Sequence, residues 1–152
     1  MPEGGLDQHY VIGSLSGEVW TSPGRCLLVK ATIPGGPGPE PWKPGNQGLR
    51  PVEGLPRESI RTGAIGSGLD LTVPAYPNMA AGDVIGLAWG AETVEGAPLT
   101  AADVDRLVVV RIHASTVTGQ GPGLVPIACQ VREVVENLSD GWSAMEIVAV
   151  ED

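Results

Sequence analysis

Glycine and proline are the residues that most restrict how this chain can fold. The 152 residues include 22 glycines and 14 prolines, about twice the share found in average proteins. Proline lacks a backbone N–H donor and glycine loses the most conformational entropy on ordering, so both interrupt helices and favour turns. We therefore expect many short elements joined by turns, and no helix longer than two turns.

The segments between these turns alternate apolar and polar residues, which is the period of a half-buried β-strand. In residues 125–135, Ile127, Cys129 and Val131 are expected to point inward, and Ala128, Gln130 and Arg132 outward. The sequence predicts an all-β protein, either a sandwich or a barrel. The expected strands are residues 10–13, 17–20, 25–33, 68–74, 84–89, 107–113, 125–135 and 142–150.

Residues 34–51 (PGGPGPEPWKPGNQGLRP) divide the chain into two predicted parts. Their prolines and glycines are incompatible with a helix or a central strand, so they predict a long surface loop or linker. Residues 1–50 are then an N-terminal extension with one or two strands and this loop, and residues 51–152 are the main domain. The loop is long enough to permit strand exchange with a neighbour, so a homo-oligomer is possible.

The charge of the chain argues against two kinds of partner. The formal net charge is −9, and such a surface repels phosphate backbones, so we expect no nucleic acid. No apolar stretch approaches the roughly 18 residues of a membrane span, so we expect no membrane insertion. The first residues lack the basic and apolar regions of a signal peptide, which leaves localisation open between the cytoplasm and an extracellular or cell-surface assembly.

The two cysteines, Cys26 and Cys129, are far apart in sequence. Two buried thiols are the simpler interpretation, and a disulfide between strands is the alternative. Neither cysteine has a nearby cysteine or histidine, so zinc is not expected. Asp103 and Asp105 lack the spacing of a calcium loop and fit a helical turn capped by Thr100. No cofactor is predicted.

Catalytic chemistry also lacks a recognisable pattern. His113 and Ser115 would face the same side of a strand, but a nucleophilic site needs a positioned acid as well. A small hydrolase is therefore the weakest hypothesis. The exposed aromatic residues that could contact a ligand or partner are Trp42, Trp20 and Trp142, and Trp42 is the one expected to be most exposed because it lies in the Pro/Gly-rich loop.

Residues 71–90 (LTVPAYPNMAAGDVIGLAWG) resemble a pattern in the Ig-like repeats of large bacterial adhesin-type surface proteins. There, a strand ends in a V-x-P-x-Y segment, a GM-x-x-GD turn follows, and the next strand ends in Trp-x-Gly or Trp-Gly. Residues 124–131, the turn Ser139-Asp140-Gly141 and residues 143–150 are similar to the last hairpin of such a repeat, with Cys129-Gln130-Val131 where the family often has Tyr-x-Val. The resemblance covers about residues 51–152.

This resemblance implies an immunoglobulin-like β-sandwich that serves as a non-enzymatic binding or structural module. Its partner would be a protein or a surface glycan, in protein–protein or cell-surface association. The alternative is a carbohydrate-binding module or a phage-tail-like structural β-protein, which predicts exposed aromatic residues in a line. By themselves, Tyr76 and Trp89 are expected to be core or rim residues, and Pro74 and Pro77 to flank an edge or corner.

Overall fold

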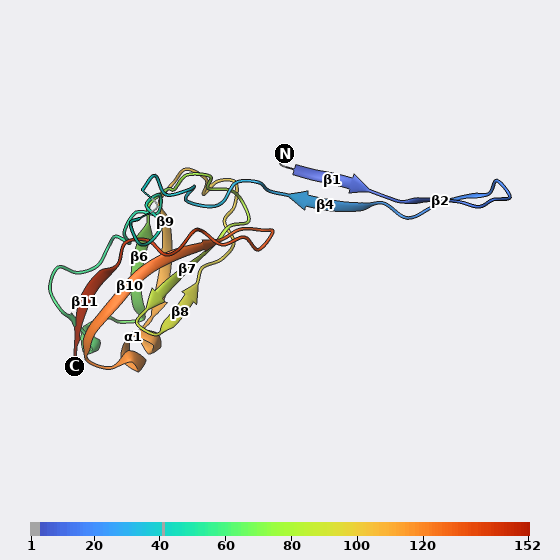
Figure 1. Cartoon of the computed structure of the whole chain (residues 1–152). Coiled ribbons are helices and arrows are strands. Elements are labelled where there is room, and N and C mark those ends of the chain that lie inside the picture. The colour runs from blue at the N-terminus through green and yellow to red at the C-terminus, as the bar shows by residue number, and fades with distance from the viewer. Residues whose placement is uncertain (1–3, 41) are drawn as a thin grey trace. The chain divides into compact units, whose positions relative to one another are not determined.

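The computed structural model describes residues 4–40 and 42–152, and the described chain is built mainly from β-strands (Figure 1). It divides into two compact units, Met1–Thr32 and Ile33–Asp152. The prediction of an all-β protein is confirmed. The Pro/Gly-rich residues 34–51 belong to the second unit, which also contains all the longer strands.

The first unit is a two-stranded antiparallel ribbon, coloured blue in Figure 1. Strand β1 (Gly4–Gln8) pairs with β4 (Arg25–Val29), and β2 (Val11–Gly13) pairs with β3 (Val19–Thr21). The chain reverses at Ser14–Gly17, where Ser14 N–H donates to Glu18 O over 2.8 Å. We call residues 4–32 the arm.

The second unit, here called the body, contains two sheets. The larger sheet has the order β5-β11-β10-β7-β8, in which only the β11–β5 pairing is parallel. The smaller sheet pairs β6 with β9, and Glu53 adds a backbone bridge to Thr72 of β6. The elements are β5 (Ile60–Arg61), the 3-10 turn η1 (Thr62–Ala64), β6 (Gly68–Val73), β7 (Val84–Trp89), β8 (Glu92–Glu95), β9 (Val108–His113), α1 (Ala114–Gln120), β10 (Gly123–Arg132) and β11 (Glu146–Glu151).

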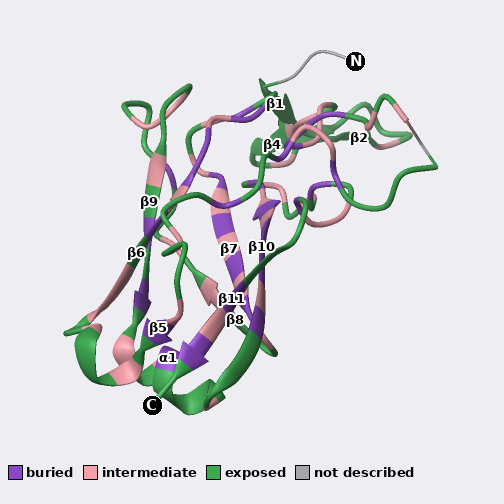
Figure 2. Cartoon of the chain, turned by 90° about the vertical axis from the view of Figure 1, so that its left-hand side faces the viewer, coloured by how far each residue is buried: buried purple, intermediate pink, exposed green. Residues whose placement is uncertain are grey.

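Both sheets contribute alternate residues to one apolar core, shown in purple in Figure 2. The inward residues predicted for β10 are confirmed, since Ile127, Cys129 and Val131 are 0% exposed. Trp89 at the end of β7 is also 0% exposed, so its large side chain fills the core as expected. Burial of this apolar surface, at roughly 25 cal/mol per Å², is the main stabilising contribution to the body.

A buried polar contact fixes the turn between β6 and β7. The Tyr76 hydroxyl donates to Asp83 Oδ2 over 2.9 Å, and the same carboxylate oxygen accepts the Ala80 N–H over 3.0 Å. Burial, followed by the charge of Asp83, raises the pKa of Tyr76 far above its usual value. Tyr76 is therefore a core residue, as predicted, whose hydroxyl holds the buried acid of the Gly-Asp turn.

Several predicted boundaries were wrong. The last strand begins at Glu146 rather than at Trp142, and the chain reverses at residues 134–136 rather than at 137–141. Strands β1, β5 and β8 and helix α1 were not predicted from the sequence. These elements are short or carry glycine and charged residues, so their apolar alternation is too weak to stand out.

The prediction of two buried thiols is half correct. Both cysteines are free, and Cys129 is buried whereas Cys26 is exposed. Cys26 lies on the arm, which has no second layer of its own to cover it. Burial raises the pKa of the Cys129 thiol, which makes it a poor nucleophile.

Candidate functional site: the outer face of the larger sheet

The outer face of the larger sheet carries several exposed apolar side chains. Its residues follow from the strand register, because directly opposite residues share a face. Ala128 lies opposite Ala88, Gln130 opposite Gly86, and Pro126 opposite Ile147. The centre of the face therefore carries small side chains. Leu124 and Ile147, toward β11, are 75% and 62% exposed.

Two buried serines position Trp142 over this face. Ser139 and Ser143 accept the backbone N–H groups of Val131 and Cys129 over 3.2 and 3.0 Å. Their own N–H groups donate to Val131 O and Cys129 O over 2.8 Å each. The two steps from Val131 to Cys129 along β10 thus lie opposite the four steps from Ser139 to Ser143, and such an excess of residues on one strand is a β-bulge. Residues 140–142, three residues opposite the single Gln130, leave the ladder and carry Trp142.

Trp142 borders two hollows in the surface of the sheet. The larger has a volume of about 380 Å³, and the smaller, of about 60 Å³, lies beside Gly86 and Gln130. We call the residues of the larger hollow, with Leu124 and Ile147, the outer-face patch. The larger hollow is lined by Ala88, Gly90, Ala91, Thr93, Pro126, Ile127, Ala128, Trp142, Ser143 and Met145.

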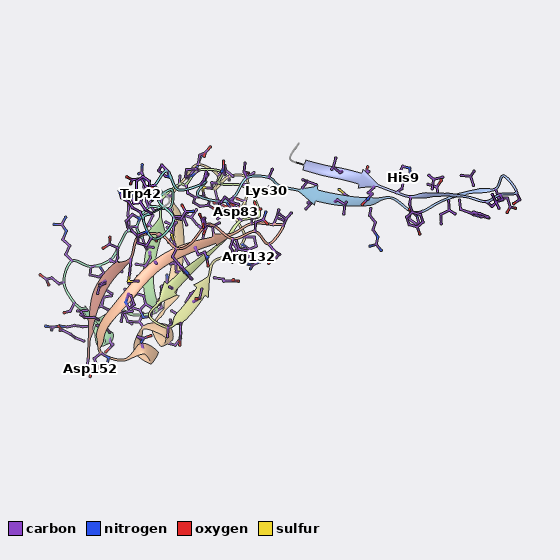
Figure 3. The ribbon with its side chains drawn as sticks, viewed as in Figure 1. His9, Lys30, Trp42, Asp83, Arg132 and Asp152 are labelled. Atoms are coloured by element: carbon purple, nitrogen blue, oxygen red, sulfur yellow. The ribbon has the colours of Figure 1, made fainter. Side chains whose placement is uncertain are left out.

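An ion-pair network around Arg132, which is labelled in Figure 3, lies beside the smaller hollow, whose lining includes Arg132 and Glu95. Arg132 donates to Glu136 over 3.0 Å and to Glu95 of β8 over 3.3 Å. The Glu136 charge, with help from Glu95, raises the pKa of the Arg132 guanidinium. These exposed pairs add little stability, but they set charged residues beside the hollow that shares Trp142 with the patch.

The Pro/Gly-rich loop is pinned by Asn46, which is 2% exposed. Its Oδ1 accepts the N–H groups of Gly48 and Leu49 over 2.9 and 3.2 Å, and its own N–H donates to Trp142 O over 2.7 Å. The loop is therefore an ordered part of the body that supports the chain at Trp142.

The three tryptophans proposed as contacts occupy different settings. Trp42, labelled in Figure 3, lies in the loop and is 77% exposed. Trp142 is half-buried, and neither hollow that it borders includes Trp42. Trp20 lies on β3 of the arm and is 53% exposed. Trp142 is thus the one that lies within a defined apolar patch.

The other candidate residues form no converging site in the described part of the chain. His113 ends β9 and Ser115 lies in α1, with no hydrogen bond joining them among residues 4–40 and 42–152. Asp103 accepts the N–H and the hydroxyl of Thr100 over 2.7 and 2.6 Å, which lowers its pKa and confirms the expected turn. No group of three His, Cys, Asp or Glu side chains that could hold a metal ion occurs in the described chain.

Sequence reasoning missed most of the patch. Met145, Ile147 and Leu124 are apolar residues that end up outside the core. Alternation within β10 did predict that Ala128 and Gln130 point outward, and Leu124 follows from the same alternation. One further extra residue lies between Ser143, which bonds to Cys129, and Glu146, which pairs with Ile127, so Met145 and Ile147 could not be assigned to a face from sequence.

Comparison of the chain with protein-family models, with curated proteins and with solved structures gives no match in any of the three. Within the described residues, the helices are too short or too polar to cross a membrane.

Proposed function

We propose that the body is an immunoglobulin-like β-sandwich that acts as a non-enzymatic binding or structural module, and that its outer-face patch binds a protein partner. Three features support the immunoglobulin-like assignment. They are the strand order of the two sheets, the parallel pairing of an early edge strand with the last strand, and a core tryptophan on the third main strand, Trp89. These features agree with the adhesin-type resemblance in residues 51–152.

The observation that carries the binding role is the exposure of large apolar side chains on one sheet face. Met145 and Ile147 are each 62% exposed and Leu124 is 75% exposed, around a hollow bordered by Trp142. Contiguous apolar surface beside charged residues is characteristic of protein-binding sites. The larger hollow would accept one aliphatic or aromatic side chain of the partner as an anchor.

The charge of the chain indicates what should surround that anchor. Beside the smaller hollow, Glu95 and Glu136 outnumber Arg132, with which both pair, in a protein with net charge −9. Complementarity then favours a partner surface with lysine or arginine around an apolar centre. Association with such a surface, on another protein or at a cell surface, is the function proposed for the body.

Selection from a random displayed-peptide library tests this proposal. Peptides are selected on the full chain and counter-selected on an Ile147→Glu variant, and their affinities are then measured by calorimetry. We expect peptides with an apolar anchor and flanking basic residues, whose binding falls at least tenfold in Ile147→Glu. Val109→Glu is the matched control, because Val109 is also 62% exposed but lies on β9 of the other sheet. An equal loss of peptide affinity in both variants, or no loss in either, would exclude the patch as the binding site.

The exposed ring of Trp42 favours carbohydrate binding as the second candidate. A 77% exposed tryptophan on a pinned loop offers a flat surface on which a sugar ring can stack. Tryptophan fluorescence titration with glycans chosen from an array would show saturable quenching that Trp42→Ala removes and Trp20→Ala preserves. Flat responses would count against a carbohydrate-binding module. A phage-tail-like structural β-protein would instead bind its own assembly partners.

A further inference from the structure

The two long edges of the arm differ in their capacity to accept another strand. Along the β3–β4 edge, residues 22–24 lie opposite His9 and Tyr10, so three residues face two. This bulge contains Pro23, and both bulges and prolines prevent a further strand from pairing. The β1–β2 edge, residues 4–13, contains no proline and no bulge. Among the described residues, β1 pairs only with β4 and β2 only with β3, so this edge is open.

The hydrogen bonds of the arm show which backbone groups face the open edge. Tyr10 N–H donates to Ser22 Oγ over 3.0 Å, and Tyr10 O accepts the Ser22 N–H over 2.9 Å. Backbone groups of successive residues point to opposite edges of an antiparallel strand. Asp7, His9 and Val11 therefore direct their N–H and C=O groups outward, toward the open edge.

The arm by itself has too little burial to be stable. An isolated two-stranded hairpin is marginal in water, whereas three or more strands with an apolar face can be stable. Nine large apolar side chains within residues 4–32 are exposed, and the ribbon has no second layer of its own to cover them. They are Leu6, Tyr10, Val11, Ile12, Leu15, Val19, Trp20, Leu27 and Leu28.

We propose that the open edge of the arm pairs antiparallel with the same edge of a second copy of the chain, about a two-fold axis at Gln8. In this register Asp7 of each copy lies opposite His9 of the other, and Leu6 lies opposite Tyr10. Acid–imidazole and aliphatic–aromatic cross-strand pairs are both favourable. Centring the axis on Asp7 would instead oppose two carboxylates, and centring it on His9 would oppose two imidazoles.

This pairing closes the assembly at two copies. The resulting four-stranded sheet has the bulged edge with Pro23 on both outer sides, so no open edge remains for a third copy. Residues 1–32 carry three acidic and two basic residues, whereas the whole chain has a net charge of −9. The arm can therefore approach another arm without the repulsion expected between two bodies.

Charge reversal in the full chain tests the register, with sedimentation velocity as the readout. The wild-type protein is expected to be a dimer that dissociates on dilution. Asp7→Lys places a cation opposite His9 in both symmetry-related pairs of the dimer, so the dimer affinity should fall about tenfold. Adding His9→Glu to Asp7→Lys restores opposite charges and should recover the affinity. Glu18→Lys makes the same charge change at the tip of the arm and should leave the dimer unchanged.

Proline substitutions test the edge itself. His9→Pro removes an N–H from the open edge, so the variant should be a monomer. The ribbon itself should survive, because the N–H of His9 (Figure 3) points away from the partner strand, unlike that of Tyr10. Cys26→Pro is the matched control, because Cys26 lies between the inward-facing Arg25 and Leu27 and so points its N–H to the bulged edge. Loss of the dimer in both variants, or in neither, would overturn the proposal.

A disulfide provides the decisive geometric readout. In a Cys26→Ser background, Gln8→Cys should form an intermolecular disulfide on mild oxidation. Cα atoms of a non-hydrogen-bonded pair lie about 4.5 Å apart, within the range of a disulfide. Arg25→Cys, on the strand opposite Gln8, should not cross-link. A wild-type protein that stays monomeric at high concentration, equal cross-linking at Arg25→Cys, or assemblies larger than two would overturn this pairing. The peptide-binding test uses residues of the body, so its result does not depend on whether the arm forms a dimer.

Discussion

The arm and the body contain the same kind of antiparallel strand pairing, but the paired residues are exposed in the arm and buried in the body. In the arm, the cross-strand pair Leu6 and Leu27 is 47% and 44% exposed, whereas in the body the pair Leu87 and Cys129 is 0% exposed at both positions. The backbone pairing is alike, so the difference lies in the second layer. The smaller sheet covers β7 and β10, while no layer within the arm covers β1 and β4. Strand formation by itself therefore does not bury apolar residues.

The difference has a functional consequence. A body with its own core can present the outer-face patch on a fixed frame, because the exposed side chains of Leu124, Met145 and Ile147 lie outside that core. An arm without a core gains its stability from whatever covers or extends it. This difference is the reason why we propose partner binding for the body and pairing between copies of the chain for the arm.

The largest expected contrast is in the reactivity of the two thiols. Cys26 of the arm is exposed and should react with maleimide at once, whereas Cys129 should react only when the body opens. Because the opening equilibrium of a stable domain is small, Cys129 should label at least about a thousandfold more slowly. Mass spectrometry of Cys26→Ser and Cys129→Ser variants separates the two rates, and fast labelling of both would remove the distinction between arm and body.

A matched pair of truncations compares packing in the two units. Leu87→Ala leaves a cavity in the core of the body and should lower the free energy of unfolding by about 3 kcal/mol. Leu28→Ala removes the same atoms from a position that is 58% exposed in the arm, so it should change the unfolding of the body by less than about 0.5 kcal/mol. Urea titration followed by circular dichroism measures both. Similar losses would mean that the arm packs as tightly as the core.

The third contrast concerns pH. In the unfolded chain the Tyr76 hydroxyl ionises near pH 10, whereas in the folded chain burial and Asp83 raise its pKa well above that value. The stabilisation linked to its proton is complete below pH 10 and is lost as the pH rises further, by up to about 1.4 kcal/mol per pH unit. Tyr76→Phe should flatten this alkaline decline, measured as the urea midpoint between pH 9 and 11. Tyr10→Phe, in the arm, should not, and an unchanged decline in Tyr76→Phe would refute the linkage.

The strands with one face against the core had the clearest sequence signal, for physical reasons. Residues 84–89 and 125–131 alternate cleanly because one face of each strand meets the core. The glycines at positions 4 and 5 have no apolar signal, although they lie in β1. The arm also has exposed apolar residues on both faces, so no single alternation marks it.

The candidate site could be predicted only in part. Exposure of Trp42 followed from its Pro/Gly-rich surroundings. The position of Trp142 depends on Ser139 and Ser143 replacing backbone partners of β10, and nothing in the local sequence distinguishes these serines from those of an ordinary turn. The single extra residue between Ser143 and Glu146 moves every following side chain to the other face, so β11 could not be assigned from alternation.

The smallest expected effect comes from one hydrogen bond that occurs in both units with the same length. Ser22 Oγ accepts the Tyr10 N–H in the arm, and Ser143 Oγ accepts the Cys129 N–H in the body, each over 3.0 Å. Ser143→Ala leaves a buried N–H unsatisfied and should cost about 1–2 kcal/mol, whereas water can replace the hydroxyl in Ser22→Ala, which should cost less than about 0.5 kcal/mol. Thermal and urea unfolding of the two variants would measure the difference. Equal costs would mean that Tyr10 and Ser22 are as well shielded from water as the core of the body, so that the arm is covered even in the isolated protein.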